Sequence, residues 1–250
     1  MTNHYLLEKQ ALPDLITSLM REHTLIAPVK TDECRFEAIT DPARVTLNDF
    51  PLFPAKKHFF PQHETLFTFH DGKLTPAYPE RKPKVLLGLR RCDLNAIKHQ
   101  DLAFSKEHTD PYYHKRRDAT LLIGIHCFKP VDTYCFCGST DIDYDAQDIM
   151  LYEQADQYLI EATTPAGEGL LASLNLPLKT TEQRIVDKKT PGTDNLTRIN
   201  LNEHYNSEKW KEPASRCIDC GACNTLCPTC YCFEIKDETN FPSLTTGKRT

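Results

Sequence analysis

The chain has 250 residues, of which 40% are hydrophobic, so it has room for one large domain, or for one domain and a small module, around a packed core. Its formal net charge of −5 gives no electrostatic reason to expect nucleic acid as a partner. The sequence shows no secretory signal and no apolar run long enough to span a bilayer. We therefore expect a cytoplasmic protein without a transmembrane segment.

The first predicted elements are one helix and two short strands. Apolar residues recur near helical spacing over residues 6–22, and Pro13 either lies in the first turn of this helix or divides it. Residues 25–29 and 34–39 have the pattern of strands. Cys34, in the second of these strands, is interpreted as a small buried apolar residue.

A hairpin is predicted next, after a segment rich in proline and aromatic residues. Asp71-Gly72 stands between residues 66–69 and 73–78 and is a signal for a tight turn. The histidines in and beyond this segment match no ligand spacing, and we interpret them as surface or packing residues: His58, His63, His70 and His99.

Two apolar runs in the middle of the chain predict a pair of parallel strands. Residues 85–92 read V-L-L-G-L-R-R-C and residues 121–127 read L-L-I-G-I-H-C, and such runs are typical of strands buried on both faces. The segment between them is helical in pattern, with Asp93 as its N-cap. This strand–helix–strand unit places Cys92 and Cys127 at the carboxyl ends of two strands, on the edge where open α/β sheets bind ligands.

The chain as a whole divides into a domain, a linker and a module. The elements predicted after residue 127 are a helix near 146–153, a strand at 158–162, a helix at 167–174 and a helix at 203–210. We expect an α/β (or α+β) domain with a parallel βαβ unit over residues 1–175, a polar linker over residues 176–200, and a small, mainly helical ferredoxin-like module over residues 201–250.

Six of the eleven cysteines lie in the run C-I-D-C-G-A-C-N-T-L-C-P-T-C-Y-C at residues 217–232. A 4Fe–4S cube has four iron corners that each take one soft thiolate, and closely spaced cysteines wrap one loop around it. Gly221 lets the backbone approach the cluster, and Pro228 turns the chain after the fourth thiolate. The first four cysteines have the spacing C-x2-C-x2-C-x3-C-P of bacterial-type ferredoxins: Cys217, Cys220, Cys223 and Cys227.

Two alternatives to a cluster are weaker. Structural zinc also uses C-x2-C pairs, but such sites usually need two well-separated pairs rather than a compact triplet. Disulfides fit a reducing cytosol and an odd number of cysteines poorly.

The role of Cys227 depends on a second motif. In two-cluster ferredoxins the fourth cysteine of this run binds the other cluster, so a second run is expected. None follows, because the chain ends eighteen residues after Cys232. Either Cys227 completes the same cube as the first three cysteines, or the sequence is a fragment.

A second soft-metal site between the two halves of the protein is a further expectation. The C-F-C pair at residues 135–137 is repeated by the C-Y-C pair at residues 230–232, and two more cysteines lie at the predicted sheet edge. The alternative is that these are buried thiols lining an interface. The choice among six candidate ligands stays open: Cys92, Cys127, Cys135, Cys137, Cys230 and Cys232.

Several motifs carry a resemblance to a known family: K-H-F-F-P-Q-H-E-T-L-F at 57–67, G-L-R-R-C-D at 88–93, D-P-Y-Y-H-K-R-R at 110–117, C-F-C at 135–137, and the cysteine run. In them the sequence resembles the family that holds the sulfhydrogenase beta subunit and the corresponding subunit of anaerobic sulfite reductase. The resemblance covers the chain from about residue 50 onward and implies a dicluster ferredoxin-like tail. Cys217, Cys220, Cys223 and Cys227 match the first cluster motif of that tail. The family's second motif would lie beyond Thr250.

The expected function is the relay of single electrons in a cytosolic redox complex. The expected partners are a catalytic subunit of a hydrogenase or reductase, and a flavin- or NAD(P)-binding subunit or a ferredoxin. One 4Fe–4S cluster is expected, and a second is a further hypothesis. The chain holds no dinucleotide fingerprint or phosphate-binding loop, and no catalytic residue is assigned. Two alternatives are a redox enzyme with a thiol or cluster site at Cys92, Cys127 and Cys137, and a zinc-stabilised interaction module.

Overall fold

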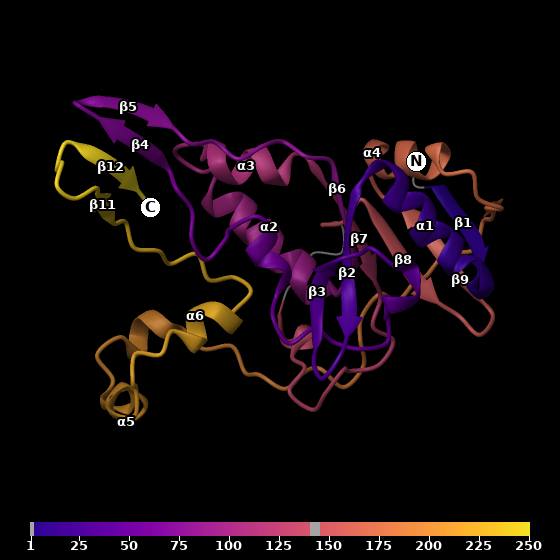
Figure 1. The fold of residues 1–250 in the computed structure, drawn as a ribbon. Coiled ribbons are helices and arrows are strands. Elements are labelled where there is room, and N and C mark those ends of the chain that lie inside the picture. Colours follow the sequence, from indigo (N-terminus) through magenta and orange to yellow (C-terminus); the bar gives the residue numbers. More distant parts are fainter. Residues whose placement is uncertain (1–2, 141–145) are drawn as a thin grey trace.

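The computed structural model describes residues 3–140 and 146–250, and its centre is a mixed eight-stranded sheet (Figure 1). Its strands are β1 (Asn3–Glu8), β2 (Thr24–Lys30), β3 (Cys34–Ala38), β6 (Lys84–Leu89), β7 (Thr120–Ile125), β8 (Ile149–Glu153), β9 (Gln157–Ala162) and β10 (Lys179–Thr180). Across the sheet their order is β10-β1-β9-β8-β7-β6-β2-β3. The neighbours from β2 through β6 and β7 to β8 are parallel, and the outer pairs are antiparallel.

Helices cover both faces of this sheet. They are α1 (Leu12–Glu22) and α4 (Pro165–Ser173) on one face, and α2 (Arg91–Ala103), α3 (Pro111–Arg117) and the 3-10 helix η3 (Ala55–His58) on the other. Successive side chains of a strand point to opposite faces, so Ile123 of β7 lies in one core with Leu15 of α1, and Leu122 lies in the other with Leu94 of α2. These layers confirm an α/β domain with parallel strands.

The predicted strand–helix–strand unit is confirmed, with one correction at the start of its helix. Strands β6 and β7 are parallel neighbours, and the connection between them holds α2 followed by α3. The helix begins at Arg91, so Asp93 is its third residue rather than its N-cap. The Asp93 carboxylate accepts a hydrogen bond from the backbone N–H of Arg90 at 3.3 Å, which satisfies a donor at the helix start.

A second sheet joins the end of the chain to the predicted hairpin. It contains β4 (Phe67–His70), β5 (Lys73–Pro76), β11 (Asp237–Thr239) and β12 (Thr246–Arg249), in the order β11-β12-β4-β5. The hairpin turn at Asp71-Gly72 is confirmed, because both residues have the positive φ that a tight two-residue turn requires. Strand β12 pairs antiparallel with β4, so residues 246–249 extend a hairpin that lies far earlier in the sequence.

Two predicted helices are wrong in part or in whole. Residues 6–8 belong to β1, because Leu6 pairs with Leu159 of β9 in the sheet, and the α-helix begins at Leu12 with Pro13 in its first turn. The helix predicted near 146–153 is instead β8 from Ile149 to Glu153. Its apolar residues are buried on both faces between β7 and β9, which a short apolar run does not distinguish from a buried helix.

The expectation of a mainly helical C-terminal module is not confirmed. Residues 203–210 hold parts of two 3-10 turns, η5 (Leu201–His204) and η6 (Glu208–Trp210), rather than one helix. Beyond them lie only the five-residue helices α5 (Lys211–Ser215) and α6 (Ala222–Leu226), followed by β11 and β12. In the described part of the chain, no helix has the length and apolar character needed to cross a membrane.

Gly88 creates an irregularity at the end of β6. Its φ is +84°, and the register with β7 shifts between Leu87 and Leu89. A side chain at this position would place its Cβ 2.9 Å from the ring of Pro28. This bulge directs the chain from the sheet into the Arg90–Cys92 turn.

We predict that Gly88→Ala lowers the free energy of unfolding by about 1 to 3 kcal/mol, because it combines a strained backbone with a close contact. Denaturant unfolding measures the effect. The control is Gly169→Ala on the exposed side of α4, where a Cβ meets nothing within 4 Å and higher helix propensity favours a gain of about 0.5 to 1 kcal/mol. Equal effects of the two substitutions would contradict this account.

His58, in η3, is largely buried and lies edge-on to Phe36, with ring centroids 6.5 Å apart. Burial lowers its pKa to about 4, and the nearby Lys57 and Lys84 add to the effect. The unfolded chain takes up a proton on His58 near pH 6.5, whereas the folded chain does so only near pH 4. Stability from this group is therefore complete above pH 6.5 and is lost as the pH falls toward 4.

We predict that His58→Phe flattens the pH dependence of unfolding in this window by up to about 3 kcal/mol. Denaturant unfolding at a series of pH values from 7 to 4 measures the difference from the parent chain. The control is His99→Gln, which removes an exposed histidine side chain from α2. A parallel loss of stability in the parent and His58→Phe proteins would overturn the assignment.

Candidate metal centre

The cysteine run lies in an exposed loop built around α6, at the lower left of Figure 1. Asp219 and Gly221 both have positive φ, so the chain turns sharply between Cys217 and the first residue of α6. Cys223 lies within α6, and the backbone N–H of Cys227 donates to the Cys223 carbonyl at 3.0 Å. The tight turn and short helix keep the first four cysteines of the run on one compact loop.

The thiols of this run are available as ligands. All eleven cysteines of the chain are free, and Cys217, Cys220, Cys223 and Cys227 are exposed. None of these four cysteines lies in a regular strand or forms a disulfide. Soft sulfur donors at this spacing match the chemistry of an iron–sulfur cube.

Cys227 has surroundings that favour its thiolate. Partial burial raises the pKa of Cys227, but hydrogen bonding to the Thr229 hydroxyl and to the backbone N–H groups of Thr229 and Cys230 outweighs it, and the Lys56 ammonium adds to the lowering. The sulfur lies 3.2 Å from the Thr229 hydroxyl oxygen. Because the thiolate is the form that binds metal, this environment suits a ligand.

Lys56 ties the loop to the α/β domain. Its ammonium donates hydrogen bonds to the carbonyls of Asn224, Cys227 and Cys230, the last two at 2.8 and 3.1 Å. These carbonyls lie at and beyond the C-terminal end of α6, where a cation is favourable. A single side chain from η3 thus satisfies three acceptors of the cysteine loop.

A group of aromatic rings and one buried amide support the same loop. Phe104 at the end of α2 faces Tyr231 with ring centroids 6.1 Å apart, and Phe60 faces Phe233 at 6.3 Å. The fully buried Gln100 of α2 donates from Nε2 to the Pro228 carbonyl at 3.1 Å. The loop is therefore packed on α2 rather than hanging free from it.

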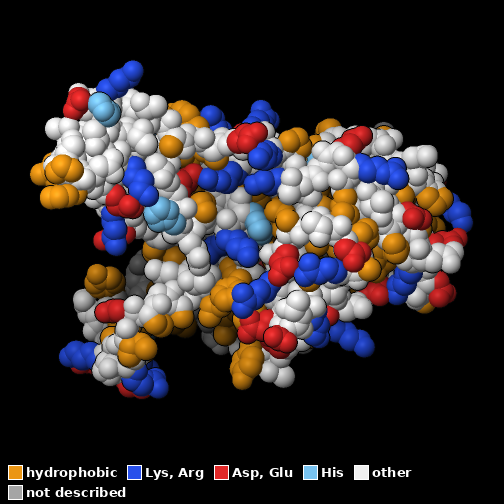
Figure 2. All heavy atoms as spheres, in the orientation of Figure 1, with side chains coloured by type: hydrophobic (Ala, Val, Ile, Leu, Met, Phe, Trp, Pro, Cys, Tyr) orange, Lys and Arg blue, Asp and Glu red, His pale blue; other side chains and the backbone are white. Residues whose placement is uncertain are grey.

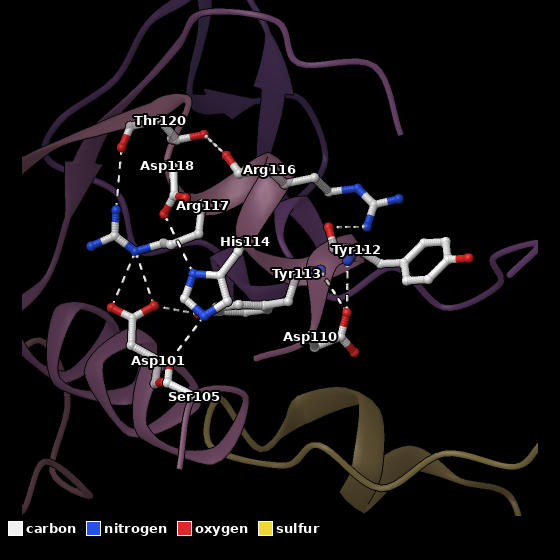
Figure 3. A network of polar contacts seen from close by, with 10 residues as sticks. All are labelled: Asp101, Ser105, Asp110, Tyr112, Tyr113, His114, Arg116, Arg117, Asp118 and Thr120. Atoms are coloured by element: carbon white, nitrogen blue, oxygen red, sulfur yellow. Dashed lines mark hydrogen bonds and ion pairs between the residues drawn. The ribbon is translucent and has the colours of Figure 1, made fainter. Parts of the chain in front are cut away.

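The D-P-Y-Y-H-K-R-R motif, which forms α3, supports α2 through polar contacts (Figure 3). Asp110 caps α3 by accepting from the backbone N–H groups of the next two tyrosines at 2.7 and 3.1 Å. Tyr113 donates to Asp101 of α2 at 2.7 Å, and Arg117 donates to the same carboxylate at 3.1 Å. Tyr113 also stacks on Phe104 at 4.6 Å, so the polar network fixes the ring against which the cysteine loop packs.

A groove of about 870 Å³ lies between the C-terminal loop, at residues 221–236, and a wall formed by residues 53–66 and 110–113. Figure 2 shows this hollow between the two projecting parts on the left. Its walls combine residues of both parts of the chain, among them Phe60, Tyr112, Thr225 and Cys232.

Comparison with known proteins agrees with this donor set. A family model described as a 4Fe-4S dicluster domain matches residues 216–250. The chain is also similar to the sulfhydrogenase 2 subunit beta of Pyrococcus furiosus, with 29% identity over 248 aligned residues that cover 92% of this chain and 73% of the relative. The resemblance drawn from the motifs is confirmed. The matched segment is a 4Fe–4S segment, and its exposed thiols are the donors that such a cofactor requires.

The structure divides the six candidate ligands of the second site between two places. Cys230 and Cys232 share a hydrogen bond on the C-terminal loop, and Cys232 lies within electrostatic reach of Cys223. The other four gather at the edge of the large sheet: Cys92, Cys127, Cys135 and Cys137. Among the described residues, no three His, Cys, Asp or Glu side chains are arranged around a single metal ion. A cube of four irons holds its thiolates farther apart than one ion does.

Some residues of these sites were not predicted from the sequence. Lys56 stands one residue before the K-H-F-F motif, and its contacts lie 168 to 174 residues away in the sequence. Gln100 shows no signal beyond an ordinary helical position. Arg90 falls inside the G-L-R-R-C-D motif, which could have pointed to its place beside the cysteines.

We predict that Lys56→Gln loosens the cysteine loop. It replaces a cation that holds three carbonyls by a shorter neutral group, and each lost charged hydrogen bond is worth about 1.5 to 3 kcal/mol at most. Hydrogen exchange of the backbone amides of residues 223–232 should become faster than in the parent chain. The control is Lys57→Gln, an exposed neighbour without these contacts, which should leave the exchange unchanged. Unaltered exchange in Lys56→Gln would show that the hydrogen bonds of Lys56 do not stabilise the cysteine loop.

Proposed function

We propose that this chain is an iron–sulfur electron-transfer subunit that relays single electrons within a larger redox complex. The observation that carries the proposal is the cysteine run at residues 217–232, which matches a 4Fe-4S dicluster domain and lies on an exposed loop packed against the α/β domain. Its proposed ligands are Cys217, Cys220, Cys223 and Cys227. When bound, the cluster supplies a centre that gains and loses one electron.

The residues of the chain hold and tune this centre. The four thiolates are the proposed ligands, and the turn at Asp219 and Gly221 bends the chain between Cys217 and Cys223. Thr229 and the Lys56 ammonium favour the thiolate of Cys227 over its thiol. Hydrogen bonds and nearby charge around the sulfurs set the reduction potential of such a centre.

The location of the loop suits exchange of electrons with another protein. Large apolar side chains stand exposed beside the cysteines, including Ile218, Leu226, Tyr231 and Phe233. Exposed apolar groups of this kind favour contact with a partner surface. A cluster near the surface then has a short path to a centre in that partner.

The partners follow by analogy with the relative, which is named as the beta subunit of a sulfhydrogenase. We infer a catalytic subunit of a hydrogenase or reductase as one partner. The second is a flavin- or NAD(P)-binding subunit, or a ferredoxin, in the cytoplasm. The α/β domain would then carry the cluster loop between the two.

We predict that the full chain, purified or reconstituted without oxygen, contains iron and acid-labile sulfide and shows the brown colour and the EPR signal of a reduced cluster after dithionite treatment. The variant Cys220→Ser should lose the iron and sulfide of one cube, because one corner lacks its thiolate. The control Cys34→Ala removes a buried thiol of β3, outside both cysteine groups, and should keep the full content.

Zinc without sulfide would favour the interaction-module alternative, and a colourless, iron-free chain would remove the electron-relay function. Turnover of a substrate by the isolated chain would favour the enzyme alternative.

A further inference from the structure

Two cysteines meet at the carboxyl edge of the large sheet, outside the centre described above. Strands β6 and β7 are parallel neighbours, with Leu87 paired to Ile123 near their carboxyl ends. Cys92 lies in the first turn of α2, just after β6, and Cys127 lies two residues after the end of β7. Each is only partly exposed.

The loop that follows β7 returns two more cysteines to this edge. Residues 190–195 hold the loop in place: Thr190 donates to the Cys127 carbonyl at 2.7 Å, and Asn195 donates to the Cys135 carbonyl at 2.6 Å. The backbone N–H of Gly138 donates to the Thr193 hydroxyl at 2.9 Å. The segment predicted as a linker thus fixes the cysteine-bearing loop through side-chain contacts.

The four thiols interact with one another. Cys92 and Cys137 share a hydrogen bond, and Cys127 is within electrostatic reach of both Cys135 and Cys137. Three segments of the chain therefore bring these four cysteines close together at one edge of the sheet.

A buried cation stands beside these thiols. Arg90 is 7% exposed, and its guanidinium donates to the Leu47 carbonyl at 2.7 Å and to the Cys127 sulfur at 3.8 Å. Its Nε–H has no partner among the described residues, and the buried carboxylate of Asp93 lies within electrostatic reach of the guanidinium. A buried cation is stabilised by negative charge around it, so Arg90 favours the anionic form of the sulfur that it contacts.

We propose that Cys92, Cys127, Cys135 and Cys137 hold a second 4Fe–4S cluster, with Arg90 compensating its negative charge. Four soft donors suit a cube, and no carboxylate or imidazole is needed. Cys230 and Cys232 belong to the C-terminal loop and are not ligands of this centre. The inference deepens the proposed electron relay by adding a centre inside the α/β domain.

Helix α2 places the two centres in sequence. Cys92 lies in its first turn, and Gln100, which contacts Pro228 of the C-terminal loop, lies eight residues further along. This separation corresponds to about 12 Å of helix axis. The two cysteine groups thus lie near opposite ends of α2, which suits a relay of electrons between them.

The test removes each centre separately from the full chain. The outer variant carries Cys217→Ser, Cys220→Ser and Cys223→Ser, and after anaerobic reconstitution with iron and sulfide it should retain the iron and sulfide of one cube. Adding Cys137→Ser should abolish that content, whereas adding Cys34→Ala should not. Circular dichroism of each purified variant confirms that the α/β domain is folded before metal is counted.

The outcomes separate the two proposals. An outer variant without iron, beside a parent chain that holds iron, overturns the inner cluster but leaves the electron relay intact. Retention of zinc without sulfide also overturns it. Iron that is retained in the outer variant and lost when Cys137→Ser is added supports the inner cluster. This result would hold even if the C-terminal loop of the parent chain bound no cluster.

The reduction potential of the inner cluster provides a second test, because a purely structural role of Arg90 would not change it. In the outer variant, Arg90→Gln should lower the reduction potential of the remaining cluster, because reduction adds negative charge that the guanidinium stabilises. Arg90→Lys keeps the charge and should shift the potential less. Equal reduction potentials in the Arg90→Gln and Arg90→Lys proteins would show that Arg90 does not compensate the negative charge of the cluster.

Discussion

The parallel pairing of β6 with β7 is the constraint on which both cysteine groups depend. It sets two strand ends side by side, so that the residues following them share one edge of the sheet. From this edge α2 runs away along one face, and its far end carries the contacts that hold the C-terminal loop. A shift of one residue in this pairing would exchange the two cores and displace both groups together.

Two cations from the α/β domain approach the two groups in different ways. Lys56 contacts carbonyls of the C-terminal loop and only indirectly favours its thiolates, whereas Arg90 contacts a sulfur. Lys56 is partly exposed and screened by water, while Arg90 is buried and acts through a lower dielectric. The same charge therefore has a stronger effect at the sheet edge than at the surface loop.

The sequence predicted the elements whose pattern is local. The apolar runs that became β6 and β7, the Asp71-Gly72 turn and the cysteine spacing were all readable without a structure. Residues 149–153 were misread because a short apolar run suits a buried strand and a buried helix equally. Lys56 and Arg90 were missed because their roles arise from contacts with distant residues. Such contacts between residues far apart in the sequence cannot be predicted from local propensity.

The pairing of β12 with β4 has a consequence for synthesis on the ribosome. The β4–β5 hairpin emerges about 170 residues before its partner strand, which at ordinary translation speeds is a delay of roughly 10 to 30 seconds. During this delay the outer edge of β4 offers unpaired backbone groups to any neighbouring chain. Nascent chains would thus depend on chaperones, or on the charged side chains around this edge, to avoid aggregation before β12 is synthesised.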